Sequence, residues 1–271
     1  MSISVIMLSF NQDKFLESAI RSVLSQDTVD LELIIIDPGS RDKSRKIASD
    51  FAFKDPRVKL IFEKDLGPAD GLNKGFRIAK NSIICYLNSD DLFLRNIFSK
   101  VERKFMRFPE IDIIYAHGII VNQKISDKPT FAFSDVISDF TLISGAARII
   151  QQSTFFRNSY SLVNDLKFNT ANETCWDYEI LVDAYLANYR FKRVNDVWGV
   201  FRIHDDSISG SGSKALQYAV DKVRIDKILK NSQSRFRVQS ALIFGFPYKL
   251  IRKIMSKIIG LRFAFSGRDV W

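Results

Sequence analysis

Residues 82–94, SIICYLNSDDLFL, join an apolar run to a polar cluster, and the rest of the chain can be organised around them. The apolar half is typical of a central parallel strand that is covered on both faces. Asn88, Ser89, Asp90 and Asp91 follow it directly, and ligands of open α/β sheets bind beyond the carboxyl ends of the strands. Adjacent acids repel each other unless a cation intervenes, and Mg²⁺ or Mn²⁺ is held by carboxylate and phosphate oxygens. The stretch therefore indicates a metal-bound diphosphate, although a turn that caps the next helix explains the same residues equally well.

Strand and helix patterns alternate in the first part of the chain. Apolar runs predict strands at 3–8, 31–36, 58–62 and 82–87, and helical spacing predicts helices at 13–26, 42–53 and 69–80. Such alternation implies right-handed βαβ crossovers and a parallel sheet. Neither a G-x-G-x-x-G nor a Walker A pattern follows the first strand, which disfavours dinucleotide-binding and P-loop proteins.

Beyond a basic amphipathic helix at 95–107 the pattern changes to shorter strands. We expect strands at 112–116, 118–121, 151–156 and 198–204, and helices at 176–189, 215–230 and 242–259. A Ser/Gly-rich segment at 207–213 is expected to be mobile. This region forms the second half of the sheet, where the acceptor side of a site can be built.

Composition indicates a folded protein of a reducing compartment. The hydrophobic content of 46% excludes a disordered chain. The opening MSISVIMLSF has no basic region and predicts a strand, not a signal peptide, and no apolar run approaches the roughly 18 residues of a membrane-spanning helix. The spacing of Cys85 and Cys175 does not suit a metal site. We therefore expect two free cysteines and a location in the reducing cytoplasm.

The net charge of +9 is concentrated in the tail. Residues 235–271 carry +7 and the remaining residues only +2. The basic residues there are Arg235, Arg237, Lys249, Arg252, Lys253, Lys257, Arg262 and Arg268, against Asp269. An anionic partner for the tail follows, either a membrane surface or nucleic acid.

Six segments, in order from residue 3 to about 210, resemble the inverting family-2 glycosyltransferases of the GT-A fold. They are ISVIMLSFNQDKFLESAIRSVLSQ, ELIIIDPGSRDKS, GPADGLNKGFRIAKNSIICYLNSDD, QQSTFFR, WDYEIL and FRIHDDSIS. The resemblance implies an α/β fold with one GT-A domain at 1–213, in which helices flank a mostly parallel sheet. The helical spacing and the charge of the remaining residues predict a basic amphipathic helical extension at 214–271. It also implies transfer of a sugar from a nucleotide-diphosphate sugar to an acceptor hydroxyl with inversion. We expect a glycan or lipid-linked glycan acceptor, in assembly of bacterial cell-surface polysaccharide or of the O-antigen of lipopolysaccharide.

The resemblance also implies the residues of the site. Asp90 and Asp91 become a DXD-like element for Mn²⁺ or Mg²⁺. The residues expected to bind the nucleotide sugar are Ser9, Phe10, Asn11, Asp37, Asp70, Lys74, Asn88, Ser89, Asp90 and Arg202. Asn88 stands where the element usually begins with Asp, and Pro38 replaces an acid often found in its turn.

An acceptor hydroxyl needs a carboxylate to take its proton as it attacks. Asp177 in WDYEIL, at a predicted helix start, is the candidate base, and Glu179 is a supporting residue. The spacing from Thr174 to Asp177 also fits a capping box that involves no chemistry. Both roles are compatible, because a helix N-terminus stabilises a carboxylate.

His204 follows a predicted strand and is a candidate metal ligand or phosphate contact, with Arg202 as a charge clamp. A structural role for His204 is equally open, and we expect one for His117. The resemblance implies that the segment at 207–213 closes over the donor and excludes water.

The tail predicts a peripheral contact with the inner face of the cytoplasmic membrane. Its apolar residues at helical spacing are Leu250, Ile251, Ile254, Met255, Ile258 and Ile259, with Lys249, Arg252, Lys253 and Lys257 in much of the remainder. A basic amphipathic helix of this kind suits anionic headgroups. A helix packed on the rest of the chain, or on a partner in a homodimer, explains the same pattern.

Two other function classes remain open. A sugar nucleotidyltransferase shares the fold and metal site, but LSFNQDK lacks the Gly-rich loop expected after its first strand. A non-enzymatic protein that binds membrane or nucleic acid explains the pI near 9.5. It leaves the acidic cluster unexplained, so we expect an enzyme without a nucleic-acid partner.

Overall fold

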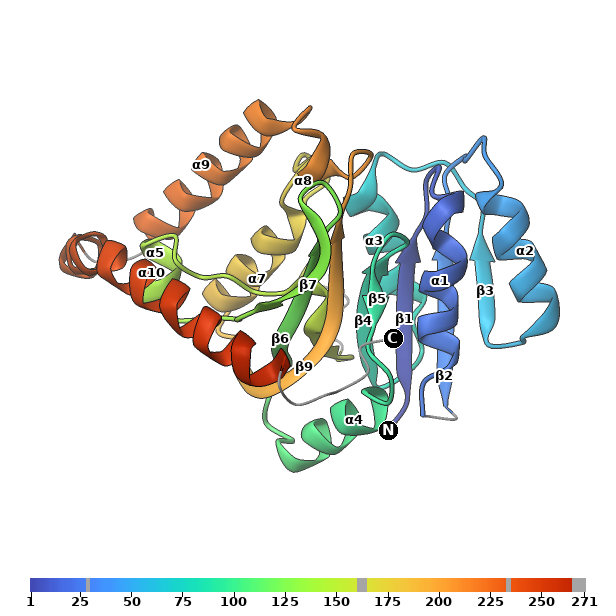
Figure 1. Cartoon of the computed structure of the whole chain (residues 1–271), viewed down its shortest axis with the longest axis horizontal. Coiled ribbons are helices and arrows are strands. Elements are labelled where there is room, and N and C mark those ends of the chain that lie inside the picture. Colours follow the sequence, from blue (N-terminus) through green and yellow to red (C-terminus); the bar gives the residue numbers. More distant parts are fainter. Residues whose placement is uncertain (28–29, 160–164, 233–234, 265–271) are drawn as a thin grey trace.

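The structure is a computed structural model that describes residues 1–27, 30–159, 165–232 and 235–264. Arg268 of the expected basic tail lies outside these residues. The side chains of Arg235, Ile258, Ile259 and Arg262 are also outside what the structure describes. Figure 1 shows a central sheet with helices on both faces and two long helices, α9 and α10, at one side.

One sheet runs through the molecule in the strand order β3, β2, β1, β4, β8, β6, β9, β5, with β7 beside β6. The strands are β1 Ile3–Leu8, β2 Leu31–Ile36, β3 Val58–Ile61, β4 Ile83–Asn88, β5 Leu92–Phe93, β6 Ile113–Asn122, β7 Ser126–Ala132, β8 Thr154–Arg157 and β9 Phe191–Ile203. β1 to β4 pair in parallel, whereas β5, β7 and β8 run antiparallel to their neighbours. The predicted α/β fold, with a central sheet and a helical C-terminal part, is confirmed.

The helices divide between the two faces of the sheet. α1 Asp13–Leu24, α2 Ser44–Lys54 and α4 Phe98–Arg107 share one apolar cluster with the sheet, and α3 Pro68–Ile78 and α7 Trp176–Leu186 share another. The shorter elements are α5 Asp139–Ile143, the 3-10 turn η1 Gln151–Ser153 and α8 Ile208–Ser211. Alternation along β1 sets the two faces, because Val5 and Met7 lie in the first cluster and Ile6 in the second.

Helix α3 lies very close to β1 because glycine occupies its inner face. A Cβ atom on Gly75 would lie 2.5 Å from Cγ2 of Ile6, and one on Gly71 would lie 3.0 Å from Cδ2 of Leu8. The first turn of α3, which carries Asp70, is thereby held at the carboxyl end of the parallel strands.

The structure differs from the sequence predictions in the second half of the sheet. Gln151–Ser153 is a 3-10 turn before β8, not the start of a strand. The strands expected at 112–116 and 118–121 form the single strand β6, whose pairing with β9 shifts register around His117. The strand expected at 198–204 is β9, which begins at Phe191, and the segment expected to be mobile contains α8.

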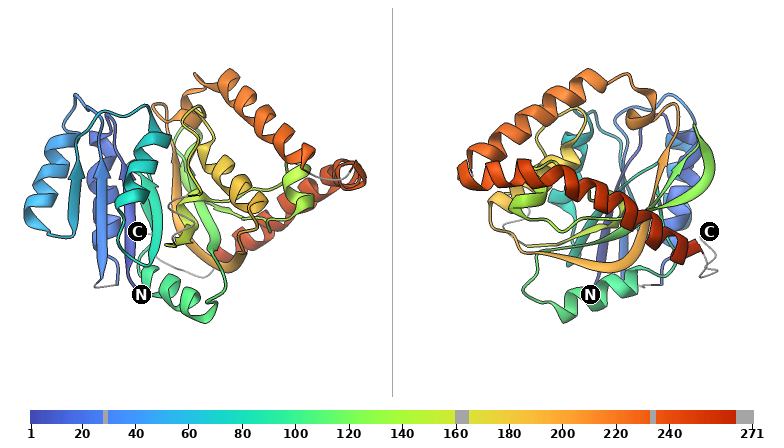
Figure 2. Two further views of the ribbon diagram at one scale, coloured as in Figure 1. Left: turned by 180° about the vertical axis from the view of Figure 1, so that it is seen from behind. Right: turned by 60° about the vertical axis from the view of Figure 1, so that its left-hand side comes forward.

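The C-terminal helices α9 Ala215–Asn231 and α10 Arg235–Ala264 pack on the body of the molecule. Ile225, Leu229 and Ala241 are buried in an apolar cluster with residues of α5 and α7. Figure 2 shows both helices at the end of the molecule away from β3. Helices α9 and α10 thus share an apolar core with the first part of the chain. The division of the chain into a domain and an extension at residue 213 remains a prediction.

Gly199 of β9 crosses directly over the turn that carries Gln152. A Cβ atom at this position would lie 2.3 Å from the backbone oxygen of Gln152. We expect Gly199→Ala to lower the free energy of unfolding by about 1–3 kcal/mol, as overpacking typically does. Urea denaturation measures this change, and an unchanged slope with denaturant is the control that the unfolded state is unaffected. An unchanged midpoint would show that the turn moves aside freely.

Candidate active site

Three neighbouring parallel strands end at one level and bring Ser9, Asp37 and Ser89 together. Leu8 pairs with Ile36 on one side and with Asn88 on the other. The Ser9 hydroxyl donates to Oδ2 of Asp37 at 3.3 Å, and the backbone N–H of Ser89 donates to the Leu8 oxygen at 3.1 Å. β1 lies between β2 and β4, so the strand order reverses here, which is where open α/β sheets bind ligands.

Asp37 is a buried carboxylate with many donors. Its Oδ1 accepts from the backbone N–H groups of Gly39 at 3.0 Å and Ser40 at 2.7 Å, and from Nε of Arg45 at 3.0 Å. Burial alone would raise the pKa of Asp37, but the hydrogen bonds from Ser40 and Arg45 outweigh it and lower the pKa. Oδ2, with its longer bond from Ser9, is the oxygen better placed for an additional donor such as a nucleobase N–H.

The loops after β1 and β2 are joined through Asn11. Its backbone is in the left-handed region, with φ of 53°, and its Oδ1 accepts from the Arg41 backbone at 2.8 Å. Phe10 beside it is 57% exposed. The Arg45 guanidinium stacks on Phe62, 4.7 Å from the ring centroid. Sequence reasoning placed Arg45 in a predicted helix and Phe62 at the end of a predicted strand, but it missed the contacts of Arg45 with Phe62 and with Asp37.

Asp70 and Lys74 form an ion pair at 3.3 Å on the first turns of α3. Lys74 Nζ also donates to the Lys64 oxygen at 2.6 Å, and Asp70 accepts from the Leu66 backbone at 3.1 Å. Asp65 completes this cluster and was also missed. Burial raises its pKa, and the charges of Asp70 and Asp37 add to that rise.

Asp91 is fully buried and bonded within the protein. Its carboxylate accepts from the backbone N–H of Arg202 at 2.9 Å and from Nε2 of Gln152 at 2.7 Å. Burial and the adjacent charge of Asp90 raise the pKa of Asp91 well above its ordinary value. Gln152 lies in the QQSTFF segment, but the sequence did not indicate its contact with Asp91.

Asp90 is partly exposed and faces His204. Its Oδ2 lies 3.1 Å from Nε2 of His204, and Nε of Arg202 donates to its backbone oxygen. Phe15 of α1 supports both partners: its ring lies 4.4 Å from that of His204 and 4.8 Å from the Arg202 guanidinium carbon. The sequence predicted only that Phe15 lies in a helix at 13–26, so its contact with the site was not foreseen.

The donor set fits a hard divalent cation. Asp90 offers a carboxylate oxygen and His204 an imidazole nitrogen, whereas both oxygens of Asp91 already have donors. Within the described ranges, no three His, Cys, Asp or Glu side chains are grouped for a metal ion. Mg²⁺ and Mn²⁺ sites commonly take only one or two carboxylates and complete their coordination with phosphate oxygens and water. The arrangement therefore favours Asp90 and His204 over Asp91 as ligands.

Asp177 is the second residue of α7, and the expected capping box is absent. The residue before the helix is Cys175, which makes no side-chain cap, and the Thr174 hydroxyl donates instead to Asp221 at 2.7 Å. The capping-box interpretation of Thr174 and Asp177 is wrong. Asp177 accepts from the Tyr178 backbone at 2.9 Å. Burial raises its pKa, and this hydrogen bond offsets part of the rise.

Asp177 is close to β4. Burial first, and then the charge of Asp177, raise the pKa of Tyr86 well above its ordinary value, so the carboxylate lies within electrostatic range of the Tyr86 phenol. Trp176 and Tyr86 also lie in the same apolar cluster. Tyr86 precedes Asn88 by two residues in β4, so the carboxylate of Asp177 is near the strand that carries the polar cluster.

Glu179 of α7 is buried and makes hydrogen bonds within the protein, and its supporting role remains a prediction. It is 4% exposed and accepts from Asn172 at 2.6 Å and from Arg224 of α9 at 2.8 Å. Asp221 of α9 accepts from Thr174, just before α7. Helix α9 thus contacts residues on both sides of Asp177 and fixes the start of α7. The sequence pattern did not reveal this contact.

Comparison with known proteins finds relatives both in sequence and in fold. A Campylobacter jejuni protein, named GalNAc(5)-diNAcBac-PP-undecaprenol beta-1,3-glucosyltransferase, is 32% identical over 238 residues, covering 84% of this chain and 74% of that protein. Staphylococcus aureus TarS in complex with UDP has a TM-score of 0.64 at 17% identity, covering 89% of this chain and 70% of TarS. The mannosyltransferase PcManGT of Pyrobaculum calidifontis, in complex with GDP-Man and Mn²⁺, has a TM-score of 0.65 at 16% identity, covering 98% and 76%.

The two structural likenesses confirm the expected GT-A fold. Several other curated glycosyltransferases are matched over a minor part of their length, since the aligned region covers 38%, 46% and 36% of three of them. The family model for glycosyl transferase family 2 matches residues 4–161, more than half of the chain. By this match and by its similarity to the Campylobacter protein, the chain belongs to glycosyl transferase family 2.

Proposed function

We propose that this chain is a metal-dependent inverting glycosyltransferase, of the hexosyltransferase type, that uses a nucleotide-diphosphate sugar. The observation that carries the proposal is the separation of two acidic groups around β4. Asp90 faces His204 just beyond the end of the strand, whereas Asp177 lies on α7, in electrostatic range of Tyr86 within the strand. One group suits a cation and its diphosphate, and the other suits an acceptor hydroxyl.

The donor nucleotide binds at the ends of β1 and β2 in this proposal. Ser9, Asn11 and the ionised Asp37 offer polar contacts, and the exposed Phe10 offers a ring for stacking. Asp70 and Lys74 lie at the sugar and phosphate side. The complexes of TarS with UDP and of PcManGT with GDP-Man support a nucleotide-diphosphate donor of this fold without selecting the base.

Asp90 and His204 hold Mn²⁺ or Mg²⁺ in this proposal. When bound, the cation neutralises the negative charge that grows on the departing diphosphate. Asp91 holds the backbone of Arg202 and the side chain of Gln152, and so fixes the strand end that presents Asp90 and His204. Asn88 and Ser89 lie between this pair and the β1 end.

Asp177 is the proposed general base. As the acceptor oxygen forms its bond to the anomeric carbon, its proton passes to Asp177 and the donor bond breaks, with the electron pair leaving on the nucleoside diphosphate. One displacement from the opposite side inverts the configuration and needs one base. A carboxylate with a raised pKa is a stronger base than an ordinary aspartate.

The proposed acceptor is a lipid-linked glycan in assembly of bacterial cell-surface polysaccharide or lipopolysaccharide O-antigen. The Campylobacter relative supports it, since its name describes transfer of glucose to an undecaprenol-linked glycan. In this proposal the enzyme works at the inner face of the cytoplasmic membrane. In the part of the chain that the structure describes, no helix has the length and apolar character to cross a bilayer.

The function is tested by mixing the protein with a panel of sugar nucleotides, Mn²⁺ and glycan acceptors. Release of UDP or GDP that depends on an acceptor supports the proposal, and NMR of the product gives the anomeric configuration. Formation of a sugar nucleotide and pyrophosphate from a sugar phosphate and a nucleoside triphosphate would instead identify a nucleotidyltransferase. If neither reaction occurs, the alternative of a non-enzymatic binding protein is favoured.

We expect Asp177→Asn to lower turnover by about 10²- to 10⁴-fold, the usual contribution of a general base. Donor affinity, measured by calorimetry, should remain. Asp183→Asn is the matched control, because Asp183 lies on the same helix and burial, together with Glu179, raises its pKa to about 6. Near-normal turnover in Asp177→Asn would remove Asp177 from the mechanism.

The raised pKa of Asp177 predicts how rate and stability depend on pH. The base must be ionised, so turnover should fall as pH drops through a pKa above the ordinary aspartate value, and this acidic limb should vanish in Asp177→Asn. A raised carboxyl pKa means that the folded state favours the protonated form, so the ionised form lowers stability at neutral pH. Asp177→Asn should therefore keep or raise the thermal midpoint, and a marked loss would indicate a structural role.

We expect Asp90→Asn to weaken binding of UDP or GDP by about tenfold or more in Mn²⁺, and to change it little without the metal. Metal sites lose about 10- to 100-fold in affinity even when an outer partner is removed. His204→Gln should act in the same direction, and Asp91→Asn should retain the metal effect while lowering stability. Calorimetry with and without Mn²⁺ measures each variant. Unchanged metal-dependent affinity in both Asp90→Asn and His204→Gln would refute the metal site.

A further inference from the structure

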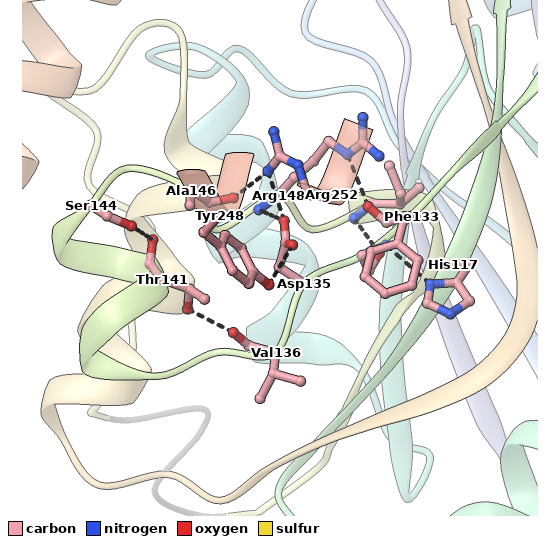
Figure 3. A network of polar contacts seen from close by, with 12 residues as sticks. His117, Phe133, Asp135, Val136, Thr141, Ser144, Ala146, Arg148, Tyr248 and Arg252 are labelled. Atoms are coloured by element: carbon pink, nitrogen blue, oxygen red, sulfur yellow. Dashed lines mark hydrogen bonds and ion pairs between the residues drawn. The ribbon is translucent and has the colours of Figure 1, made fainter. Parts of the chain in front are cut away.

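Helix α10 is fixed to the body of the molecule through polar side chains. Tyr248 donates its hydroxyl hydrogen to Oδ1 of Asp135 at 3.0 Å, and Arg252 forms an ion pair with Oδ2 at 2.8 Å (Figure 3). Asp135 is fully buried, and the backbone N–H of Arg148 also donates to it at 2.8 Å. Leaving a buried carboxylate without its partner is strongly destabilising. These contacts therefore determine which side of α10 faces inward.

The docked side continues along the helix at regular spacing. Ala241 is buried, Gly245 lies where a Cβ atom would be 2.5 Å from that of Ser144, and Ser256 donates to the Phe131 oxygen at 3.3 Å. Together with Tyr248 and Arg252, these residues recur every three or four positions, which places them on one face.

The opposite face of α10 is apolar and exposed. The side chains along its centre are Ile243, Phe246, Leu250 and Ile254, exposed by 68%, 77%, 55% and 52%, and those at its sides are Leu242, Phe244, Ile251 and Met255. We call these eight residues the outer face. Isolated exposed apolar residues are ordinary, but a contiguous apolar patch marks an interaction surface. Of the apolar residues in the expected membrane helix, those with described side chains all lie on this face.

A row of lysines borders the outer face. Lys249, Lys253 and Lys257 are spaced four residues apart, and Lys253 and Lys257 are exposed. Arg252, which sequence reasoning grouped with them, is turned inward to Asp135. Residues 235–264 contain no Asp or Glu. The surface thus combines an apolar strip with positive charge and has no acidic group of its own.

We infer that the outer face of α10 docks on an anionic lipid surface, with its apolar side chains at the acyl boundary and its lysine row among the headgroups. This is the arrangement of an interfacial helix. A second copy of the chain is a poorer occupant, because it would present the same lysines and no acidic residue of α10 to pair with them. The inference goes beyond the proposed reaction, because it requires neither donor nor acceptor.

Vesicle flotation tests the inference with the full chain. The probes are phosphatidylcholine vesicles with and without a minor fraction of phosphatidylglycerol. We expect binding to the anionic vesicles only, and we expect added NaCl to weaken it. Each basic residue near an anionic surface is worth about fivefold in binding, so Lys253→Gln with Lys257→Gln should lower the partition coefficient by about 25-fold.

The apolar part is tested by Phe246→Ser, Leu250→Ser and Ile254→Ser combined, which should abolish flotation. The matched control is Leu216→Ser, Val220→Ser and Val223→Ser on α9, which are exposed by 81%, 54% and 67% but lie outside the outer face. The control should float like the parent. Circular dichroism and nucleotide affinity, which do not involve the outer face, report whether each variant is folded.

Two results would overturn the inference. The first is a parent protein that does not float with anionic vesicles at low salt, or an α10 variant that floats equally well. The second is a parent dimer in sedimentation equilibrium that the α10 substitutions dissociate, which would make the outer face a self-interface. Flotation does not depend on sugar transfer. A negative transfer assay would therefore refute the proposed function without refuting the docking of α10 on lipid.

Discussion

The site depends on the hydrogen bonds that the buried carboxyl group of Asp91 accepts. Burying a polar group without hydrogen-bond partners costs several kcal/mol, and the carboxyl group of Asp91 has partners in the backbone of Arg202 and the amide of Gln152. Those donors come from β9 and from the turn before β8, so one side chain after β4 joins three elements that are far apart in the sequence. Asp90 and His204 face each other because the chain on either side of them is held this way. The close approach of Gly199 to the turn of Gln152 belongs to the same arrangement, since no larger residue fits there.

The parallel half of the fold was predictable because its signals are local. Unbroken apolar runs at β1, β2 and β4 indicate strands buried on both faces, and the polar residues at their ends must meet at one edge of the sheet. The resemblance implied Ser9, Asp37 and Ser89 as site residues, and the geometry of the strand ends explains why they meet. The other half pairs strands across long distances in sequence, and β7 and the turn at Gln151 arise from contacts that no window of sequence contains. Phe15, Arg45 and Phe62 were missed for a similar reason: a helical or strand-end position reveals the element, but not which ring or guanidinium lies beside the ligand edge.

Local reasoning failed instructively at the start of α7. The spacing of Thr174 and Asp177 satisfies a capping pattern, but a hydroxyl that can donate to a buried carboxylate gains a stronger, charge-assisted bond than a cap provides. Asp221 of α9 is that carboxylate. Asp177 is consequently free of a capping partner at the N-cap and stays available for chemistry, while α9 fixes the residues before it. A C-terminal extension therefore contributes to the position of the proposed base, which makes the boundary at residue 213 a feature of sequence pattern more than of packing.

Helix α10 reverses the usual relation between pattern and packing. An amphipathic helix normally turns its apolar stripe to the core, and by that rule membrane contact and packing on the body are competing explanations of one face. Here the core side offers the buried Asp135, so Arg252 and Tyr248 satisfy it and the apolar stripe points outward. Packing on the body and the proposed membrane contact are then compatible, because they involve opposite faces of the same helix. The choice was not visible in the sequence, because it depends on a carboxylate more than a hundred residues earlier. A polar anchor has a further physical consequence: it fixes the rotation of α10 about its axis, so that the apolar strip and its lysine row present a surface of defined orientation instead of a helix that can roll to bury them.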